Sequence, residues 1–524
     1  MESVETHPSR KALIRTWIGF AMMCVGMFMA ILDVQIVATS LPTMQSALGI
    51  PPDQMSWVQT AYLIAEVIAI SLTGFLTRLL SMRWLFVLAT SVFTMASLGC
   101  AASNSFEVLI SWRVLQGFAG GTLIPAVFSA VFLMFPIQRQ GIATMLAGVL
   151  AVLAPTVGPI VGGWITETYS WHWLFLINIL PGVIAATVGG LLLPKTSVRL
   201  EEARTLDFQS LTLIAIALAA LEIALKEAPQ RGWTSGLVAG LLVLSLASMS
   251  GFVRRTLRAS HPVVDLSSFS DRNFTIGCIL SFVLGIGLFG SVYLMPVFLA
   301  FVRGHNALEI GAIMLVTGVA QLSIAPVAVA LEQRLDVRLL TAAGFALFAA
   351  GLGLSALQTP ETDYDAMFWP QVIRGLAIMF CLLPPTRLAL GSLDKLRVAD
   401  ASGVFNLMRN LGGAIGLALI DTVIYSRSPV HANEISNRLL AGDVSAARFV
   451  GIPLDIFAAH GSGPLHAFTQ ALVKPLVEKA ALTLAINEAW AMIAALTLTV
   501  LVCLPFAKRA SGLHSDQKNL TLQK

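Results

Sequence analysis

Long apolar runs recur along almost the whole chain and limit what it can fold into. They begin near Trp17 and continue nearly to the C-terminus. Each has roughly 18 to 25 residues, enough to cross a bilayer core of roughly 30 Å. Of the 524 residues, 12% are charged, far below the roughly 25% typical of soluble domains. The sequence therefore predicts an all-α polytopic membrane protein.

Fourteen membrane spans are predicted from these runs. Cytoplasmic loops carry more Lys and Arg than outer loops, which tests the topology independently. With the N-terminus inside, the inner segments hold Arg78, Arg139 and Arg338 among many others, whereas the short outer loops hold little beyond Arg231 and Arg303. Both termini are therefore expected in the cytoplasm. The predicted limits are 16–41, 57–79, 83–102, 107–134, 142–165, 172–193, 208–226, 234–253, 273–300, 308–331, 339–357, 368–390, 402–425 and 486–507.

The spans group into three blocks. Weak similarity between RVLQGFAGG in span four and VIRGLAIMF in span twelve, each followed by proline, indicates duplication. Six plus two plus six spans are typical of transporters that bind substrate between repeated bundles. The expected blocks are an N-terminal six-helix bundle over 1–194, two extra spans with cytoplasmic connectors over 195–272, and a C-terminal six-helix bundle over 273–524 with a long outer loop at 426–485.

The stretch APTVGPIVGG in span five predicts a bent helix with a smooth face. Ala154, Gly158 and Gly162 are spaced by four, so two helix backbones can approach closely across them. Pro155 and Pro159 each remove a backbone donor and bend the helix, which a membrane helix tolerates. Such a helix suits two bundles that rock against each other; the alternative is a tight crossing with only a structural role.

Several motifs follow one another in a fixed order. The first span reads LDVQIVATSLP, and Arg113, Gln116 and Gly117 form Arg-x-x-Gln-Gly in the fourth. Gly158-Pro159 and Gly162-Gly163 stand in the fifth span, WHWLFLINILPG enters the sixth, and RNLGGAIG begins at Arg409. Together these motifs resemble the major facilitator superfamily, specifically its 14-span drug:proton antiporters of the EmrB/QacA type. The resemblance implies two six-helix bundles with two inserted linker helices.

The inner loop between spans two and three departs from that family's pattern. The family usually carries an Asp, a following Arg and a Gly there. In this chain those positions are Arg78, Leu79 and Ser81, while Gly74 and Arg83 remain. The resemblance therefore does not carry the family's conformational latch over to this chain.

Ionisable side chains inside the spans are the candidates for function, because a charge at the bilayer centre costs about 2.5–3.5 kcal/mol on insertion scales. By helix rise, Asp33, Glu66 and Arg113 lie roughly 12, 14 and 9 Å from the outer ends of their spans, and thus share one layer. Burial disfavours a charged carboxylate and a nearby arginine favours it, so this set could exchange a proton or a cationic substrate. We predict Asp33 and Glu66 as proton or cation sites and Arg113 as their modulator. The alternatives are an outward-snorkelling arginine and a locally hydrogen-bonded Glu66.

Four further residues are secondary candidates. Gln116 belongs to the fourth-span pattern, and Arg374 mirrors either Arg113 or, with the glycine that follows it, Gln116. Arg409 lies about 10 Å from the inner face and either serves gating or snorkels. Asp421 lies near the outer end of span thirteen, where a solvated carboxylate is the favoured interpretation.

Several function classes are excluded or disfavoured. The five cysteines all fall in predicted spans without paired spacing and the histidines are scattered, so we expect no metal and no cofactor. No G-x-x-x-x-G-K-[ST] motif occurs, and no Ser/His/Asp set lies at one depth. We therefore expect neither ATP hydrolysis nor an enzyme. The net charge of +4 sets orientation and does not indicate nucleic acid.

The resemblance implies proton-coupled efflux of amphipathic or cationic compounds by alternating access in a bacterial inner membrane. The expected partners are drug-like small molecules, protons and the lipid bilayer. In a double-membraned bacterium, a periplasmic adaptor and an outer-membrane channel join them, with loop 426–485 as a lid, a docking surface or a solvated hairpin. Two alternatives remain: a dedicated exporter of one metabolite or acidic compound on this fold, and a non-transporting receptor or scaffold.

Overall fold

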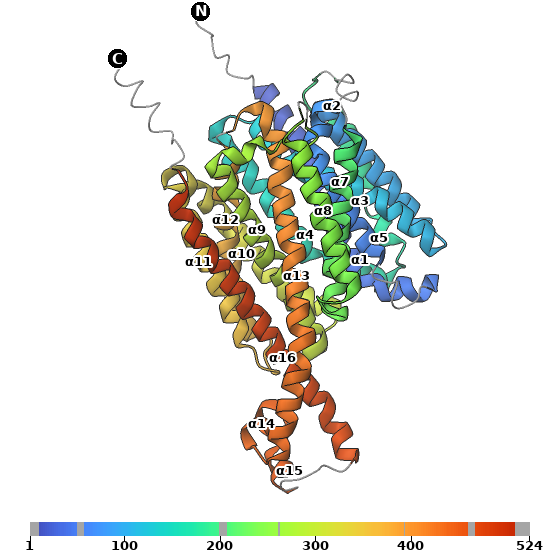
Figure 1. Cartoon of the computed structure of the whole chain (residues 1–524), viewed down its shortest axis with the longest axis vertical. Helices are drawn as coiled ribbons and strands as arrows, with labels where there is room; N and C mark the ends of the chain where they lie inside the picture. Colours follow the sequence, from blue (N-terminus) through green and yellow to red (C-terminus); the bar gives the residue numbers. More distant parts are fainter. Residues whose placement is uncertain are drawn as a thin grey trace, which may run out of the picture.

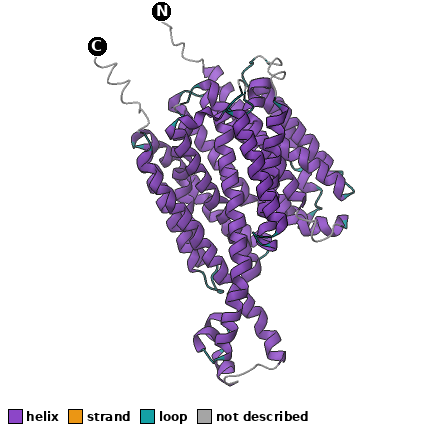
Figure 2. Ribbon diagram, in the orientation of Figure 1, coloured by secondary structure: helices purple, strands orange, loops and turns teal. Residues whose placement is uncertain are grey.

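Long helices run side by side in a bundle, and a smaller helical projection extends from one end (Figure 1). The computed structural model describes residues 10–49, 57–196, 198, 207–259, 262–391, 393–459 and 467–508. Helices joined by short loops make up these residues, which contain no strand (Figure 2). The predicted all-α membrane fold is confirmed. Most of the charged connector expected after Lys195 lies outside the described residues.

The helices follow the predicted spans closely. Within the described residues, 13 segments are long and apolar enough to cross a membrane. One of them, α2, has 45 residues and covers predicted spans two and three. The 13 segments therefore agree with fourteen spans. The helices are α1 Arg10–Leu48, α2 Trp57–Ala101, α3 Phe106–Met134, α4 Ile137–Thr168, α5 Trp173–Leu176, α6 Ile179–Leu192, α7 Phe208–Arg231, α8 Gly236–Thr256, α9 Arg272–Phe298, α10 Ala307–Arg334, α11 Val337–Leu354, α12 Tyr364–Leu390, α13 Lys395–Leu440, α14 Val444–Val450, α15 Leu454–Ala459 and α16 Ala467–Thr499, with short turns η2 Leu266–Ser270, η3 Leu299–Arg303, η4 Ser355–Leu357 and η5 Val500–Phe506.

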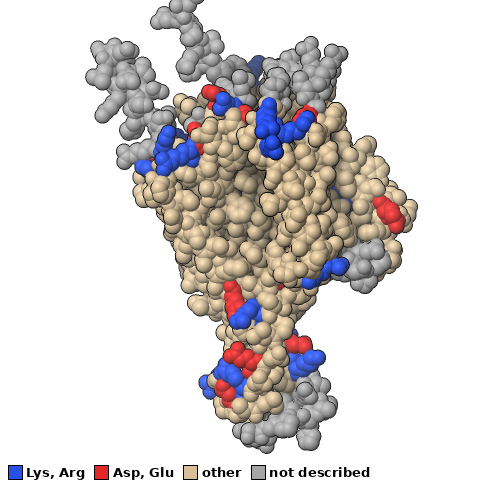
Figure 3. All heavy atoms as spheres, in the orientation of Figure 1, with Lys and Arg blue, Asp and Glu red and all other residues tan. Residues whose placement is uncertain are grey.

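The two ends of the bundle differ. Helix α1 begins and η5 ends at one end, called the terminal end here, and the projection extends from the other, the projection end (Figure 1). Charged side chains gather at both ends and on the projection, while the belt between them is largely uncharged on the face in view (Figure 3). This distribution fits a membrane around the belt, because charge inside lipid is costly.

Small residues allow the closest helix contacts. Gly117 and Gly121 of α3 lie directly against the backbone carbonyls of Tyr62 and Glu66 in α2, where a side chain would collide. In α4, Gly158 lies against a side chain of α1. The small-residue face of α4 is thus a close contact with α1. Within the sequence motif, Ala154, Gly158, Pro159, Gly162 and Gly163 are buried, and Pro155 is half-buried.

Helices from the two ends of the sequence meet along α4, α10 and α13. Helix α10 packs on α4, and α13 packs on α2 and α3 as well as on α9. The inserted pair, α7 and α8, forms a hairpin, and α7 touches both α2 and α13. A hydrogen bond of 3.0 Å from the Trp233 indole nitrogen to the Thr422 hydroxyl ties this hairpin to α13.

The projection is a helical unit with its own small core. It consists of the far end of α13, then α14 and α15, and the beginning of α16 (Figure 1). Ile435, Leu439, Ala447 and Val477 are buried together in it. Helix α13 ends at Leu440 and α14 begins at Val444, so the outer segment at 426–485 is helical over most of its described length. Residues 460–466 lie outside the described part.

Ser81 turns the chain between the two spans of α2. Its φ of 68° and ψ of 156° lie in a region that favours glycine, because a Cβ atom is strained there. Ser81 is the one non-glycine residue with positive φ in the described chain. Its hydroxyl is buried without a hydrogen-bond partner among the described residues. The turn is therefore strained in this sequence.

We expect Ser81→Gly to stabilise the protein, because glycine removes the strained Cβ atom. The gain over Ser81→Ala, which removes only the hydroxyl, should be about 1 kcal/mol. Thermal unfolding of the purified variants in detergent measures the difference. Equal midpoints for the two variants would show that the backbone at this turn carries no strain.

Candidate functional site

Asp33 of α1 is the centre of a buried polar cluster. It is completely buried and forms an ion pair with Arg113 of α3. It also accepts hydrogen bonds from Gln116 Nε2 at 3.0 Å and from Asn178 Nδ2 at 2.9 Å. Because Asn178 lies in the turn between α5 and α6, one carboxylate ties together three separate segments.

Arg113 is held in place by its own contacts. Its Nε donates to the carbonyl of Val58 at 3.0 Å, and one terminal nitrogen donates to Gln116 Oε1 at 2.7 Å. The guanidinium lies 4.3 Å from the ring centre of Tyr62, whose hydroxyl donates to the carbonyl of Ala30 at 3.1 Å. Arg113 is fully buried and does not snorkel outward. The predicted association of Asp33 and Arg113 is present in the structure, and Gln116 joins it.

A cavity of about 100 Å³ lies beside this cluster. Val34 and Gln35, which follow Asp33 directly, line it. Its walls come from α1, α2, α3 and α4 on one side and from α9, α12 and α13 on the other, and most of them are apolar. The cavity therefore lies between helices from the two ends of the sequence, where a repeated-bundle transporter holds its substrate.

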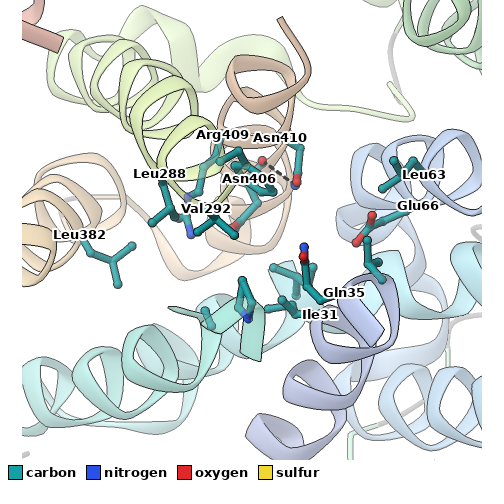
Figure 4. A pocket seen from close by; sticks show the side chains of 15 residues that line it. Ile31, Gln35, Leu63, Glu66, Leu288, Val292, Leu382, Asn406, Arg409 and Asn410 are labelled. Atoms are coloured by element: carbon teal, nitrogen blue, oxygen red, sulfur yellow. Dashed lines mark hydrogen bonds between the residues drawn. The ribbon is translucent and has the colours of Figure 1, made fainter. Parts of the chain in front are cut away.

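Two ionisable side chains face the cavity from opposite sides. Figure 4 shows Glu66 of α2 near Gln35, and Arg409 beside Asn406 of α13 across from them. Glu66 is 5% exposed and makes no hydrogen bond or ion pair with another residue of the described chain. Arg409 is 7% exposed, lies 5.2 Å from the ring centre of Phe128, and has no described partner for Nε or one terminal nitrogen. Arg409 thus points into the protein instead of snorkelling.

This arrangement can bind a ligand that carries charge. A buried charge without a partner is costly in an apolar surrounding. A cation at Glu66, a proton on Glu66, or an anion at Arg409 would each lower that cost. The Asp33 carboxylate, in contrast, already has three donors, from Arg113, Gln116 and Asn178.

Comparison with known proteins agrees with this architecture. Residues 23–417 match the Major Facilitator Superfamily. The chain belongs to this superfamily. The "Colistin resistance protein EmrB" of Acinetobacter baumannii is 40% identical over 427 residues, which cover 81% of this chain and 83% of that protein. The "Multidrug export protein EmrB" of Escherichia coli K12 is 30% identical over 487 residues, which cover 93% and 94%.

A solved structure shows the same fold at low identity. The human organic anion transporter MFSD10 superposes with a TM-score of 0.59 at 12% identity and covers 95% of this chain and 100% of that one. The chain is therefore an integral membrane transporter of the drug-efflux type within the Major Facilitator Superfamily, and the expectation that it is not an enzyme is confirmed by this membership.

Two of the secondary candidate residues, Arg374 and Asp421, lie away from the Asp33 cluster. Arg374 of α12 is buried over the ring of Trp490 in α16. Asp421 of α13 is half-buried and accepts a hydrogen bond of 2.7 Å from the Tyr293 hydroxyl. Asp421 is therefore partly open to solvent, as predicted, and in addition has a protein partner on α9.

The inner-loop motif makes an ion pair that sequence reasoning missed. Arg78 of α2 pairs with Asp400 of α13 and also donates to the carbonyl of Pro262 at 3.3 Å. Gly74 lies directly against Asp400, so no side chain fits there. Arg83 lies beyond the turn, 5.7 Å from the ring centre of Trp84. A basic residue thus occupies the position where the related family carries an acidic one, and the acidic partner is on the other helix.

Other residues of the site could be found from sequence only in part. Asn178 stands in the aromatic-to-Asn-Pro stretch that resembles the sixth span, so its position was marked but its contact with Asp33 was not. Gln35, Asn406 and Asn410 line the cavity without any motif that identifies them. Asp400 lies just before the predicted limit of span thirteen, where a charge needs no buried partner.

We expect Arg113→Gln to destabilise the protein by about 3–5 kcal/mol, because it leaves the Asp33 carboxylate buried without its cation. The double variant Asp33→Asn with Arg113→Gln should recover more than half of the loss, since two amides can hydrogen-bond to each other. Thermal unfolding in detergent tests this. Additive losses in the double variant would show that the two side chains do not depend on each other.

Proposed function

We propose that this transporter exports amphipathic cationic compounds in exchange for protons. The observation that carries the proposal is the Glu66 carboxylate, which faces an apolar cavity between two sets of helices without a partner in the described chain. A proton or a substrate cation can neutralise this carboxylate, but not both at once. Such competition is the minimum that antiport requires.

Glu66 is placed to influence the Asp33 cluster. It lies one helical turn after Tyr62 on α2, and the Tyr62 ring covers Arg113. Gly121 of α3 touches the backbone of α2 at Glu66. A shift of α2 on protonation of Glu66 would therefore move the ring and helix that hold Arg113. In this proposal Glu66 exchanges the proton or cation, and Asp33 and Arg113 transmit the change.

Access to the cavity depends on contacts at the terminal end. Along α2 and α13, Arg78 and Asp400 lie about 18 and 9 Å beyond Glu66 and Asn406 toward that end. A hydrogen bond of 2.9 Å from the Ser402 hydroxyl to the carbonyl of Pro125 lies in the same region. We propose that α1–α6 move against α9–α13 and α16 as two bundles, and that opening toward the terminal end breaks these contacts. Pro155 in the cavity wall removes a backbone donor from α4, which would assist this movement.

The projection suits a docking role. It has a core of its own, and Glu488 of α16 braces its base by accepting hydrogen bonds from Arg427 at 2.7 Å and from His431 at 2.8 Å. In the proposed topology the terminal end is cytoplasmic and the membrane is a bacterial inner membrane. The projection then extends into the periplasm, where a periplasmic adaptor that leads to an outer-membrane channel would bind it.

Arg409 favours a second candidate function. Its guanidinium faces the same cavity with two nitrogens unpaired in the described structure, so an acidic compound could be the exported substrate. On this alternative, Glu66 would carry only the proton. The two substrate classes depend on different residues, and one experiment can separate them.

We expect Glu66→Gln to abolish pH-gradient-driven transport of a lipophilic cation such as ethidium in proteoliposomes, because the only carboxylate facing the described cavity is lost. Asp33→Asn should reduce the same flux at least tenfold. The matched control is Glu107→Gln, an exposed acid at the start of α3, which should keep wild-type flux.

Unchanged coupled flux in Glu66→Gln would contradict the proposed exchange. Flux of a dodecanoate-type anion that survives Glu66→Gln at neutral pH but is lost in Arg409→Gln would favour the acidic-substrate alternative instead.

We further expect Arg78→Asp and Asp400→Arg each to destabilise the protein by about 1–3 kcal/mol, because each leaves a partly buried charge beside a like charge. The double variant restores an ion pair with the opposite polarity and should recover both stability and transport. Thermal unfolding and ethidium flux measure the two effects. A double variant no better than the singles would show that the pair does not join the two helices in the working protein.

A further inference from the structure

A second buried arginine lacks an acidic partner. Arg374 of α12 is 3% exposed, and its guanidinium lies 4.8 Å from the ring centre of Trp490. Its Nε and one terminal nitrogen have no hydrogen-bond partner in the described chain, and neither has the Trp490 indole nitrogen. Both side chains can only donate hydrogen bonds. Arg374 and Trp490 therefore lie together as two buried side chains with hydrogen-bond donors that have no acceptor in the described chain.

The surroundings of Arg374 resemble the Asp33 cluster but contain no carboxylate. Gly117 of α3 lies against the carbonyl of Tyr62 in α2, and Gly375 of α12 lies against the carbonyl of Thr317 in α10 in the same way. The residue before Gly117 is Gln116, which donates to Asp33 of α1. The residue before Gly375 is Arg374, which donates a hydrogen bond to the weak acceptor Met295 Sδ of α9 at 3.4 Å.

Met295 thus occupies the place that Asp33 has in the other set of helices. This parallel also favours the register in which Arg374 corresponds to Gln116. A buried arginine stands where an arginine–carboxylate pair could form, but the chain supplies a thioether in place of the carboxylate.

A pocket of about 270 Å³ opens beside this arginine. It lies near the projection end of the bundle, lined by Arg374 and Met295 in its interior and by residues of α11, η4 and the start of α12. Most of the wall is apolar. Leu357 and Trp369, which are 75% and 67% exposed, line its outer part on the surface of the bundle.

We propose that this pocket binds the carboxylate or phosphate group of an amphipathic anion. Arg374 offers the planar donor fork that suits such oxyanions, and the apolar tail of the ligand lies along Leu357 and Trp369. The anion supplies the charge that Met295 does not. The ligand is a single-chain amphipathic acid or the headgroup of an anionic lipid, which share this chemistry. The site is separate from the central cavity and does not rest on the proposed direction or coupling of transport.

Thermal unfolding of the full-length protein in the neutral detergent dodecyl maltoside tests the proposal by binding alone. Dodecyl phosphate and laurate should raise the unfolding midpoint of the wild type with a saturable concentration dependence. Dodecanol and dodecyltrimethylammonium, which have the same chain without negative charge, should not. In Arg374→Gln the half-saturating concentration of laurate should rise at least tenfold, whereas Arg374→Lys should retain part of the response.

A second variant keeps the test decisive if Arg374→Gln folds poorly. Met295→Asp supplies a carboxylate from within the chain, at the place that Asp33 has in the other cluster. We expect this variant to fold and to lose the response to laurate and dodecyl phosphate, because Arg374 is then already paired. Full laurate binding by Met295→Asp would overturn the proposal.

The control is Arg231→Gln, which removes an exposed arginine at the end of α7 and should keep the response to laurate, while Arg409→Gln tests the central cavity. A response that is lost in Arg409→Gln but kept in Arg374→Gln would place the anion in the central cavity and overturn the proposal. An equal shift by dodecanol would also overturn it. Phosphatidylglycerol in mixed micelles distinguishes the sources: protection by this lipid that depends on Arg374 assigns the site to a lipid headgroup, and protection by laurate alone assigns it to a free amphipathic acid.

Discussion

The buried ion pair between Asp33 and Arg113 is the interaction on which the N-terminal helices depend. Neither charge reaches water, so each needs a partner, and α1, α3 and the α5–α6 turn must meet to provide the partners. Tyr62 adds α2 through its ring and hydroxyl. Because Val34 and Gln35 follow Asp33 on α1, the position of this pair also sets the wall of the central cavity. The Asp33–Arg113 pair therefore positions both the N-terminal helices and one wall of the central cavity.

The buried charges of this protein divide into satisfied and unsatisfied ones. Asp33 and Arg113 form an ion pair, and further hydrogen bonds to both side chains hold helices together. Glu66, Arg409 and Arg374 are also buried but form no ion pair within the described chain, and both arginines have nitrogens without a hydrogen-bond partner there. A charge that remains unpaired in lipid is costly, and a ligand that supplies the missing charge is stabilised in return. The unpaired set marks both the central cavity and the separate pocket at Arg374.

An ion pair between Arg78 of α2 and Asp400 of α13 joins two distant parts of the sequence at the terminal end. The family that this chain resembles usually carries an acidic residue at the position of Arg78. The same loop carries Ser81 where glycine is usual, and the backbone keeps the conformation that favours glycine. The turn therefore keeps a conformation that its own residue does not favour.

Sequence alone determined the helical membrane class and the order of the spans, because crossing a bilayer imposes length and apolar composition on each segment. It did not determine that α13 and α16 continue 15 and 19 residues beyond the predicted limits, at 425 and 486. It also determined that Asp33, Glu66 and Arg113 share one depth, because helix rise is constant. It could not say which charges pair, since depth leaves the rotation and neighbours of each helix open. Only the tertiary structure decided that Asp33 is satisfied while Glu66 faces the cavity, that Arg409 faces the cavity and not the membrane surface, and that Met295 stands opposite Arg374. Those outcomes depend on which faces of distant helices pack together, and contacts between residues hundreds of positions apart leave no local pattern.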